Sequence, residues 1–143
     1  MSRLIIDATD AILGRLASYV AKELLRGSHV DIVNAEKAVI SGRRENIFEE
    51  YKAWMETRQL ANPRRGPFHP RYPEEIVRLA IRGMLPYKKP KGREAFKRLR
   101  VYRGVPEHLA GKEMLRVPDA DAKKLKCKRI KVEELSRFLG AKI

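Results

Sequence analysis

Apolar residues in the first third of the chain recur at two different periods, which together predict a βαβ unit. Short runs rich in β-branched residues at Arg3–Asp7 and His29–Ala35 are typical of strands. Between them, apolar side chains from Leu13 to Leu25 recur at helical spacing, and Gly27 supplies a C-terminal stop. A strand, a helix and a second strand within about 30 residues favour a parallel sheet with a right-handed crossover.

The pattern continues with one more short strand, at Lys37–Ser41, and two more helices. The first of these helices covers residues 45–58, where we interpret one apolar and aromatic face as core: Ile47, Phe48, Tyr51, Trp54 and Met55. The second begins at Pro73, a residue suited to the first helical position. Its predicted buried face is Ile76, Val77, Ala80, Ile81 and Met84. Arg78 and Arg82 point outward from it, and Pro86 closes it.

Residues 87–104 mix cations with helix-breaking residues. Pro90 and Gly92 predict a turn-rich basic loop, followed by a short helical start and a strand at Leu99–Gly104 with Val101 directed inward. Charges from the helix end, the loop and the strand would then converge on one basic rim at residues 82–104.

The distribution of charge indicates an anionic partner. The chain has 143 residues, about the length of one domain, and 43% of them are apolar. Its net charge is +14, of which +11 falls within residues 58–104, while residues 1–57 carry −1. A binding surface explains this concentration better than a uniformly solvated one. We therefore expect a single domain over residues 1–143 that binds nucleic acid.

The stretch at residues 59–73 holds four prolines and one glycine, which exclude a regular helix or a central strand. We interpret it as an extended loop whose cations and imidazole suit contacts with phosphates and bases: Arg64, Arg65, His69 and Arg71. A plain surface loop, with Phe68 and Tyr72 packed into the core, is the alternative.

Targeting and metal-binding signals are missing from the sequence. Cys127 is the only cysteine, which leaves no intramolecular disulfide or cysteine-based zinc site. No secretory signal and no apolar run of about 18 residues is present. We expect a cytoplasmic protein with no membrane partner, metal or cofactor.

Three sequence blocks resemble the ribosomal protein L13 family of the large subunit. They are LGRLAS (residues 13–18), VNAEKAVISG (33–42) and IRGMLPYKKPKGREAFKRLRVYRG (81–104), in the family's order. The tail KRIKVEELSRFLGAKI resembles the archaeal and eukaryotic branch. Bacterial members carry a His-rich segment after the third block, where this chain reads VPEHLAGKE.

The resemblance implies a three-layer α/β/α fold with a small parallel sheet and basic loop extensions. It also implies a structural ribosomal constituent that binds large-subunit ribosomal RNA, contacts neighbouring ribosomal proteins, supports assembly and takes no small-molecule substrate. Carried over by motif, the RNA-facing residues are Arg82, Lys88, Lys89, Lys91, Arg93, Lys97, Arg98, Arg100 and Arg103. Arg15, Arg43 and Arg44 are further candidates, while Gly83 and Met84 serve packing or turns.

An RNA- or nucleotide-modifying α/β enzyme with a basic substrate-binding arm is the alternative. The sequence has no glycine-rich nucleotide loop and no nucleophile elbow, and its three histidines are far apart. Asp7, at the end of the first strand, stands where parallel-sheet enzymes place functional groups. Capping of the following helix is the simpler role for Asp7. Asn34 is expected to cap or bridge backbone at the end of the second strand.

Overall fold

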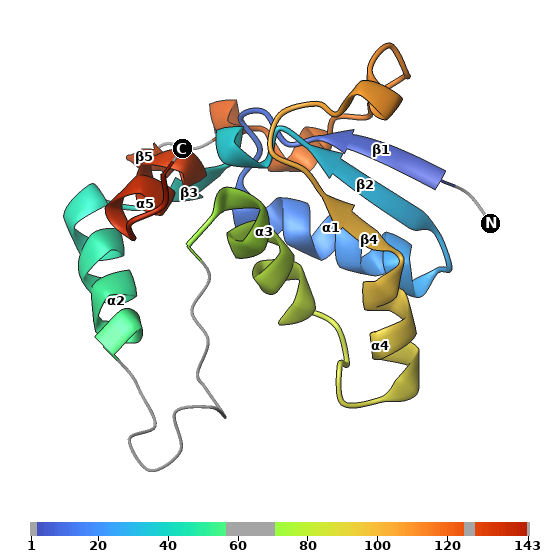
Figure 1. The fold of residues 1–143 in the computed structure, drawn as a ribbon, viewed down its shortest axis with the longest axis horizontal. Helices are drawn as coiled ribbons and strands as arrows, with labels where there is room; N and C mark the ends of the chain where they lie inside the picture. Colours follow the sequence, from blue (N-terminus) through green and yellow to red (C-terminus); the bar gives the residue numbers. More distant parts are fainter. Residues whose placement is uncertain (1–2, 57–70, 125–127, 143) are drawn as a thin grey trace.

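A parallel sheet forms the centre of the computed structural model, which describes residues 3–56, 71–124 and 128–142. Its three strands lie in the order β1 (Arg3–Asp7), β2 (His29–Val33) and β4 (Leu99–Val101). Leu4, Val30 and Leu99 form one row across the sheet, since β1 and β4 both pair with β2 in parallel. The predicted βαβ unit is therefore confirmed (Figure 1).

The connecting helix α1 (Leu13–Leu25) forms where the sequence predicts it. Its buried stripe has the expected helical spacing: Leu13, Leu16, Ala17, Val20, Ala21 and Leu24. Burying each of the larger side chains contributes about 1.5–3 kcal/mol. The chain leaves the helix through Gly27, whose φ of +98° is a left-handed conformation that a glycine adopts without strain.

Two further helices, α3 (Pro73–Arg82) and α4 (Pro90–Lys97), pack beside α1 on the same face of the main sheet (Figure 1). The prediction of a loop across residues 87–94 is wrong for α4. Pro90 occupies its first turn, where the missing N–H has no helical partner to lose. Gly92 and Ala95 are buried, so tertiary packing outweighs the low helix propensity of this segment.

The prediction that Met84 is buried is also wrong. Helix α3 ends at Arg82, and the backbone N–H of Met84 bonds to the carbonyl of Ile81 in a turn. Met84 is 46% exposed, whereas Ile81, inside the helix, is fully buried. The apolar period of the sequence continues to Met84, but the helix ends at Arg82 with Gly83 as its C-cap residue. Gly83 keeps its predicted turn role.

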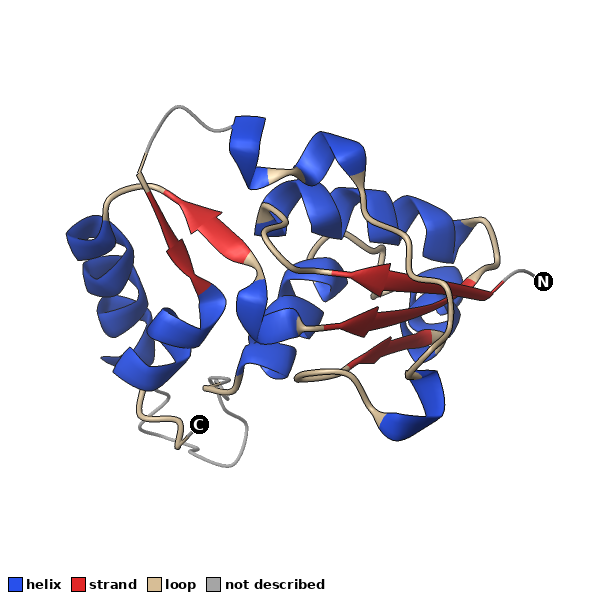
Figure 2. Ribbon diagram, turned by 90° about the horizontal axis from the view of Figure 1, so that it is seen from above, coloured by secondary structure: helices blue, strands red, loops and turns tan. Residues whose placement is uncertain are grey.

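A second, smaller sheet lies apart from the first (Figure 2). Strands β3 (Val39–Ser41) and β5 (Arg129–Lys131) pair in antiparallel fashion, with Ile40 opposite Ile130. Helix α5 (Val132–Phe138) follows β5 directly and lies beside α2 (Arg44–Glu56). Phe48 and Phe138 stack between these helices with ring centroids 4.2 Å apart. The aromatic face predicted for α2 is only partly core, because only Ile47 is fully buried.

The other face of the main sheet is crossed by the chain that follows β4 (Figure 1). This segment contains the fully buried Leu109 and reaches the free edge of β1, where Leu115 bridges to Ile6. The α/β class with a small parallel sheet is confirmed, with unequal helical layers on the two faces. The short 3₁₀ helices are η1 (Ala35–Lys37), η3 (Glu107–Leu109), η4 (Pro118–Ala120) and η5 (Ala122–Lys124).

Candidate nucleic-acid interface

Helices α3 and α4 and the turn between them carry a dense set of exposed cations. Both helices are amphipathic, and their apolar stripes, such as Ile76 and Val77 of α3, face the core. Their basic residues are therefore left on the outer surface. We call this surface the α3–α4 patch, and it consists of Arg78, Arg82, Lys88, Lys89, Lys91, Arg93 and Lys97.

Two arginines of the patch lie over aromatic rings. The Arg82 guanidinium carbon is 4.0 Å from the ring centroid of Tyr87, and that of Arg78 is 4.7 Å from the centroid of Phe96. The two rings contact each other edge to face, with centroids 5.6 Å apart. Cation–π contacts of this kind hold guanidinium groups in place before any ligand arrives. Less side-chain entropy is then lost on binding.

The turn that bears Lys88 and Lys89 is held from α4. The Arg93 side chain donates to the carbonyl of Tyr87 at 3.1 Å and to that of Lys88 at 3.4 Å. Gly92 approaches the backbone of Pro86 so closely that a Cβ built on it would lie 2.0 Å from the Pro86 oxygen. Only a glycine permits this contact. Arg93 thus supports the turn, while the two lysines on it are free to meet a ligand.

The patch has little negative charge to neutralise it. Between Arg78 and Arg98 the sequence has eight Lys or Arg residues and one acid, Glu94. In the described part of the chain, no carboxylate forms an ion pair with any of the seven patch cations. A surface of unpaired positive charge attracts an anion over a distance of about a Debye length.

Three cations at the end of the predicted rim lie elsewhere. Arg98 is half-buried and donates to the Leu24 carbonyl at 2.5 Å, so it ties the C-terminal turn of α1 to β4. Arg100 alternates with the buried Leu99 and therefore lies on the opposite face of the sheet from the helices. Arg103 lies past the other end of β4, 5.6 Å from the Tyr72 ring. The expectation that residues 82–104 form one rim does not hold for these three.

The other predicted contact residues that the structure describes are not brought to the patch. Arg43 and Arg44 lie at the start of α2, at the opposite end of the molecule from α4 (Figure 1). Arg15 is exposed on α1 and donates to the carbonyl of Asp119 at 3.2 Å. Arg71 is exposed, and its carbonyl accepts a hydrogen bond from the Ser136 hydroxyl. Arg64, Arg65 and His69 lie outside the described residues.

The carboxyl end of β1 forms a small pocket around Asp7, the place where the enzymatic alternative would need its chemistry. The pocket has a volume of about 180 Å³. One Asp7 oxygen accepts hydrogen bonds from the Thr9 amide at 3.0 Å, the Thr9 hydroxyl at 2.6 Å and the Asn34 amide at 3.1 Å. Asp7 therefore does not cap α1, whose N-cap is Ile12. Asn34 is the N-cap residue of η1, as expected, but its side chain bonds to the Asp7 carboxylate and not to backbone.

The charge state of Asp7 argues against acid–base catalysis. Burial alone would raise its pKa, but hydrogen bonds from Thr9 and Asn34 and the charge of Arg116 lower the pKa below its ordinary value of 3.8. A general base or acid working near neutral pH needs a pKa shifted the other way. Asp7 is thus a stable anion that joins the ends of β1 and β2. No group of metal-ligating side chains occurs among the described residues.

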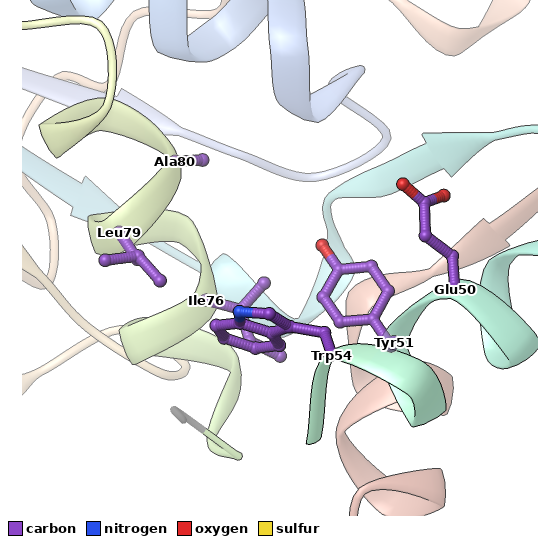
Figure 3. Close-up of a pocket in the computed structure, with 6 residues that line it drawn as sticks. All are labelled: Glu50, Tyr51, Trp54, Ile76, Leu79 and Ala80. Atoms are coloured by element: carbon purple, nitrogen blue, oxygen red, sulfur yellow. The ribbon is translucent and has the colours of Figure 1, made fainter. Parts of the chain in front are cut away.

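A second hollow lies between α2 and α3 (Figure 3). Tyr51 and Trp54 of α2 and Ile76 and Leu79 of α3 line a space of about 320 Å³. Burial, with a smaller contribution from Glu50, raises the pKa of the Tyr51 hydroxyl above its usual value of 10.0. A phenol held neutral beside apolar side chains offers no nucleophile or base, so Tyr51 gives this hollow no catalytic group.

The fold and its surface define a small α/β protein with an unpaired basic patch and no catalytic constellation among the described residues. In the part of the chain that the structure describes, no helix has the length and apolar content to cross a membrane. Residues 2–108 match the family model described as Ribosomal protein L13. The chain belongs to the ribosomal protein L13 family.

Similar proteins cover nearly the whole chain. The large ribosomal subunit protein uL13 of Methanocaldococcus jannaschii is 52% identical over 139 residues, which are 96% of this chain and 98% of the relative. The uL13 proteins of Sulfolobus acidocaldarius and Archaeoglobus fulgidus are 47% and 46% identical, over 95% of this chain and 92% and 86% of their own lengths. The resemblance of the tail to the archaeal branch is confirmed. The protein is a structural ribosomal protein and not an enzyme.

Sequence reasoning leaves three residues out of the candidate surface. It puts Arg78 on the outer face of its helix without marking it as a contact residue. Tyr87 and Phe96 were not predicted from the sequence, because their roles depend on contacts between α3 and α4. The sequence feature that could have indicated these contacts is the four-residue spacing of Arg78 and Arg82, followed by aromatic residues in the next segment.

Proposed function

We propose that this protein is a constituent of the cytoplasmic large ribosomal subunit that binds ribosomal RNA through the α3–α4 patch. The observation that carries the proposal is the set of seven exposed cations without a carboxylate partner in the described chain. Family membership supports the ribosomal setting, because the similar proteins are named large-subunit proteins.

The physical basis of binding is counterion release. Each Lys or Arg that neutralises a phosphate frees a condensed cation, so affinity falls steeply as salt rises. Shape and phosphate contacts, rather than base edges in a deep groove, dominate the recognition of RNA helices. A rigid patch on two packed helices suits this mode, because its charges are already spaced when RNA arrives.

A role in assembly follows from the same property. Folded RNA segments repel one another through their phosphates, and a compact basic domain lowers that repulsion where it docks. We propose that the protein supports large-subunit assembly and contacts neighbouring ribosomal proteins through surfaces outside the patch.

The test compares two quadruple variants with matched charge. The first changes the patch residues Lys88, Lys89, Lys91 and Lys97 to glutamine, leaving Arg93 because it supports the turn. The control changes Lys22, Lys37, Lys52 and Lys142, which lie outside the patch, to glutamine. Binding to purified large-subunit RNA is measured as a function of salt, and incorporation is followed by sedimentation.

The patch variant is expected to flatten the dependence of log affinity on log salt by about 2–3 units. It should also leave the large-subunit fraction at lower salt than the wild type. The control variant should shift the slope by much less. Equal shifts in both variants would mean that RNA senses only net charge, and the assignment of the patch would be abandoned.

A further inference from the structure

Three cations of the α3–α4 patch line a hollow whose apolar surface would stay empty if only a phosphate backbone bound there. Its volume is about 670 Å³, within the roughly 300–1,000 Å³ typical of small-ligand pockets. Its apolar lining consists of Leu79, Gly83, Leu85, Pro86 and Tyr87, and its cationic lining consists of Arg82, Lys88 and Lys89. We propose that this hollow takes one unstacked base of the bound RNA, while the three cations hold the phosphates beside it.

The floor of the hollow suits a flat apolar ligand. Leu79 is 37% exposed although α3 packs into the core, so its side chain presents apolar surface to solvent. Arg82 lies over Tyr87 at 4.0 Å, and both residues line the hollow. Bases of unpaired RNA stack on aromatic rings and on the planes of guanidinium groups. In the Arg82–Tyr87 pair each group covers one face of the other, so a base would stack on a remaining outer face of the ring or of the guanidinium.

The shape of the hollow is fixed before binding. Backbone hydrogen bonds from Leu85 to Arg82, from Tyr87 to Leu85 and from Lys89 to Pro86 close successive turns of the loop. Arg93 holds the same loop from α4. A preformed cavity loses little conformational entropy when it is filled.

The charge on the rim selects the kind of occupant. An apolar side chain of another protein would fit the floor, but it would bring no negative charge to the rim cations. A nucleotide brings a flat base and a phosphate together. An acidic peptide is the competing ligand, and the experiment below includes it.

This inference rests on the proposed function, and its test separates the two. The probe is a ten-residue oligouridine carrying 4-thiouridine, compared with inorganic polyphosphate of the same charge and with a ten-residue polyglutamate. The protein variants are Tyr87→Leu, which removes the ring but keeps an apolar side chain, and Tyr87→Phe, which restores it. Tyr72→Leu is the matched control, since Tyr72 also lies under an arginine, Arg103, but outside the hollow.

We expect Tyr87→Leu to lower affinity for oligouridine about 5- to 150-fold, the range for loss of one stacked base. Its affinity for polyphosphate should fall much less, since only the positioning of Arg82 by the ring is lost, and its salt slope should not change. Tyr87→Phe should restore binding, and Tyr72→Leu should behave as wild type. Irradiation should cross-link the thiouridine to the peptide that contains Tyr87. Thermal melts confirm that each variant is folded.

Four results would overturn the inference. The first is an equal loss of oligouridine and polyphosphate binding in Tyr87→Leu. The second is the absence of any effect of Tyr87→Leu on oligouridine binding, and the third is the absence of oligouridine binding by the wild type. The fourth is Tyr87-dependent binding of polyglutamate in place of RNA. In each case, binding of ribosomal RNA by the wild type, with a salt slope that depends on the patch lysines, would leave the proposed function intact.

Discussion

Substitution of Gly92 by alanine tests the contact on which the turn of the α3–α4 patch depends. A Cβ at this position would lie 2.0 Å from the oxygen and 2.3 Å from the carbon of the Pro86 carbonyl, and 2.9 Å from the Tyr87 nitrogen. Ordinary van der Waals contact begins near 3.4 Å. All three obstructing atoms belong to backbone, so no side-chain rotation can relieve the clash.

The size of the effect follows from two opposing contributions. Alanine favours a helix over glycine by about 1 kcal/mol. Overpacking of a closely packed site costs typically 1–3 kcal/mol and sometimes more, and a carbonyl that must retreat by more than about 1 Å belongs at the upper end. We expect Gly92→Ala to lower the free energy of unfolding by about 2 kcal/mol and the melting temperature by roughly 5–10 °C.

Gly14→Ala is the matched control, because Gly14 lies in α1 and a Cβ added to it would have no atom within 4 Å apart from the neighbouring residues and backbone of its own helix. That variant should be as stable as the wild type or more stable, by up to about 1 kcal/mol. Both are measured by thermal and urea unfolding followed by circular dichroism. Below its melting temperature, Gly92→Ala should also bind RNA more weakly, since relief of the clash moves Lys88 and Lys89. If Gly92→Ala proves as stable as Gly14→Ala, the close approach of α4 to Pro86 does not exist in solution.

Further predictions concern residues outside this contact. Met84→Ala should change the free energy of unfolding by less than about 0.5 kcal/mol, whereas Ile81→Ala should cost about 2–5 kcal/mol; reversal of that order in urea unfolding would refute the boundary of α3. Folding lowers the pKa of Asp7, so the stabilising contribution of its carboxylate is present above the ordinary pKa of 3.8 and is lost as pH falls through the lower folded value. An Asp7→Asn variant should therefore lose less stability on acidification than the wild type. Arg98→Met should lower the free energy of unfolding by roughly 1 kcal/mol through the lost bond to Leu24, while the salt slope of RNA binding stays as in the wild type; a flatter slope would make Arg98 an RNA contact.

The elements with a clear apolar period were predictable from the sequence. Helix α1 has a continuous buried stripe and a glycine stop, and β1 and β2 are short apolar runs on either side of it. Helix α4 was not predictable in this way, because Pro90 and Gly92 break helices in isolation. It forms because Pro90 stands in the first turn and Gly92 meets Pro86 across the fold, a contact that no local pattern encodes.

The candidate surface was predictable in composition but not in geometry. A run of cations along a sequence does not show which face each side chain takes. In β4, alternation puts Arg100 on the face opposite the helices, and the half-buried Arg98 bonds to α1. The single-domain organisation and the individual RNA contacts stay predictions.

The pairing of β3 with β5 has a consequence for the order of events during synthesis. Val39 lies opposite Lys131, so β3 obtains this partner only after about ninety further residues have been made. At typical elongation rates of about 5–20 residues per second, that delay is roughly 5–20 s. Through this interval the edge of β3 that later receives β5 has unpaired backbone groups, the kind of edge on which nascent chains associate. The carboxyl-terminal segment therefore covers the edge of β3 only at the end of synthesis. A chain that stops before β5 should aggregate even though its parallel sheet is complete.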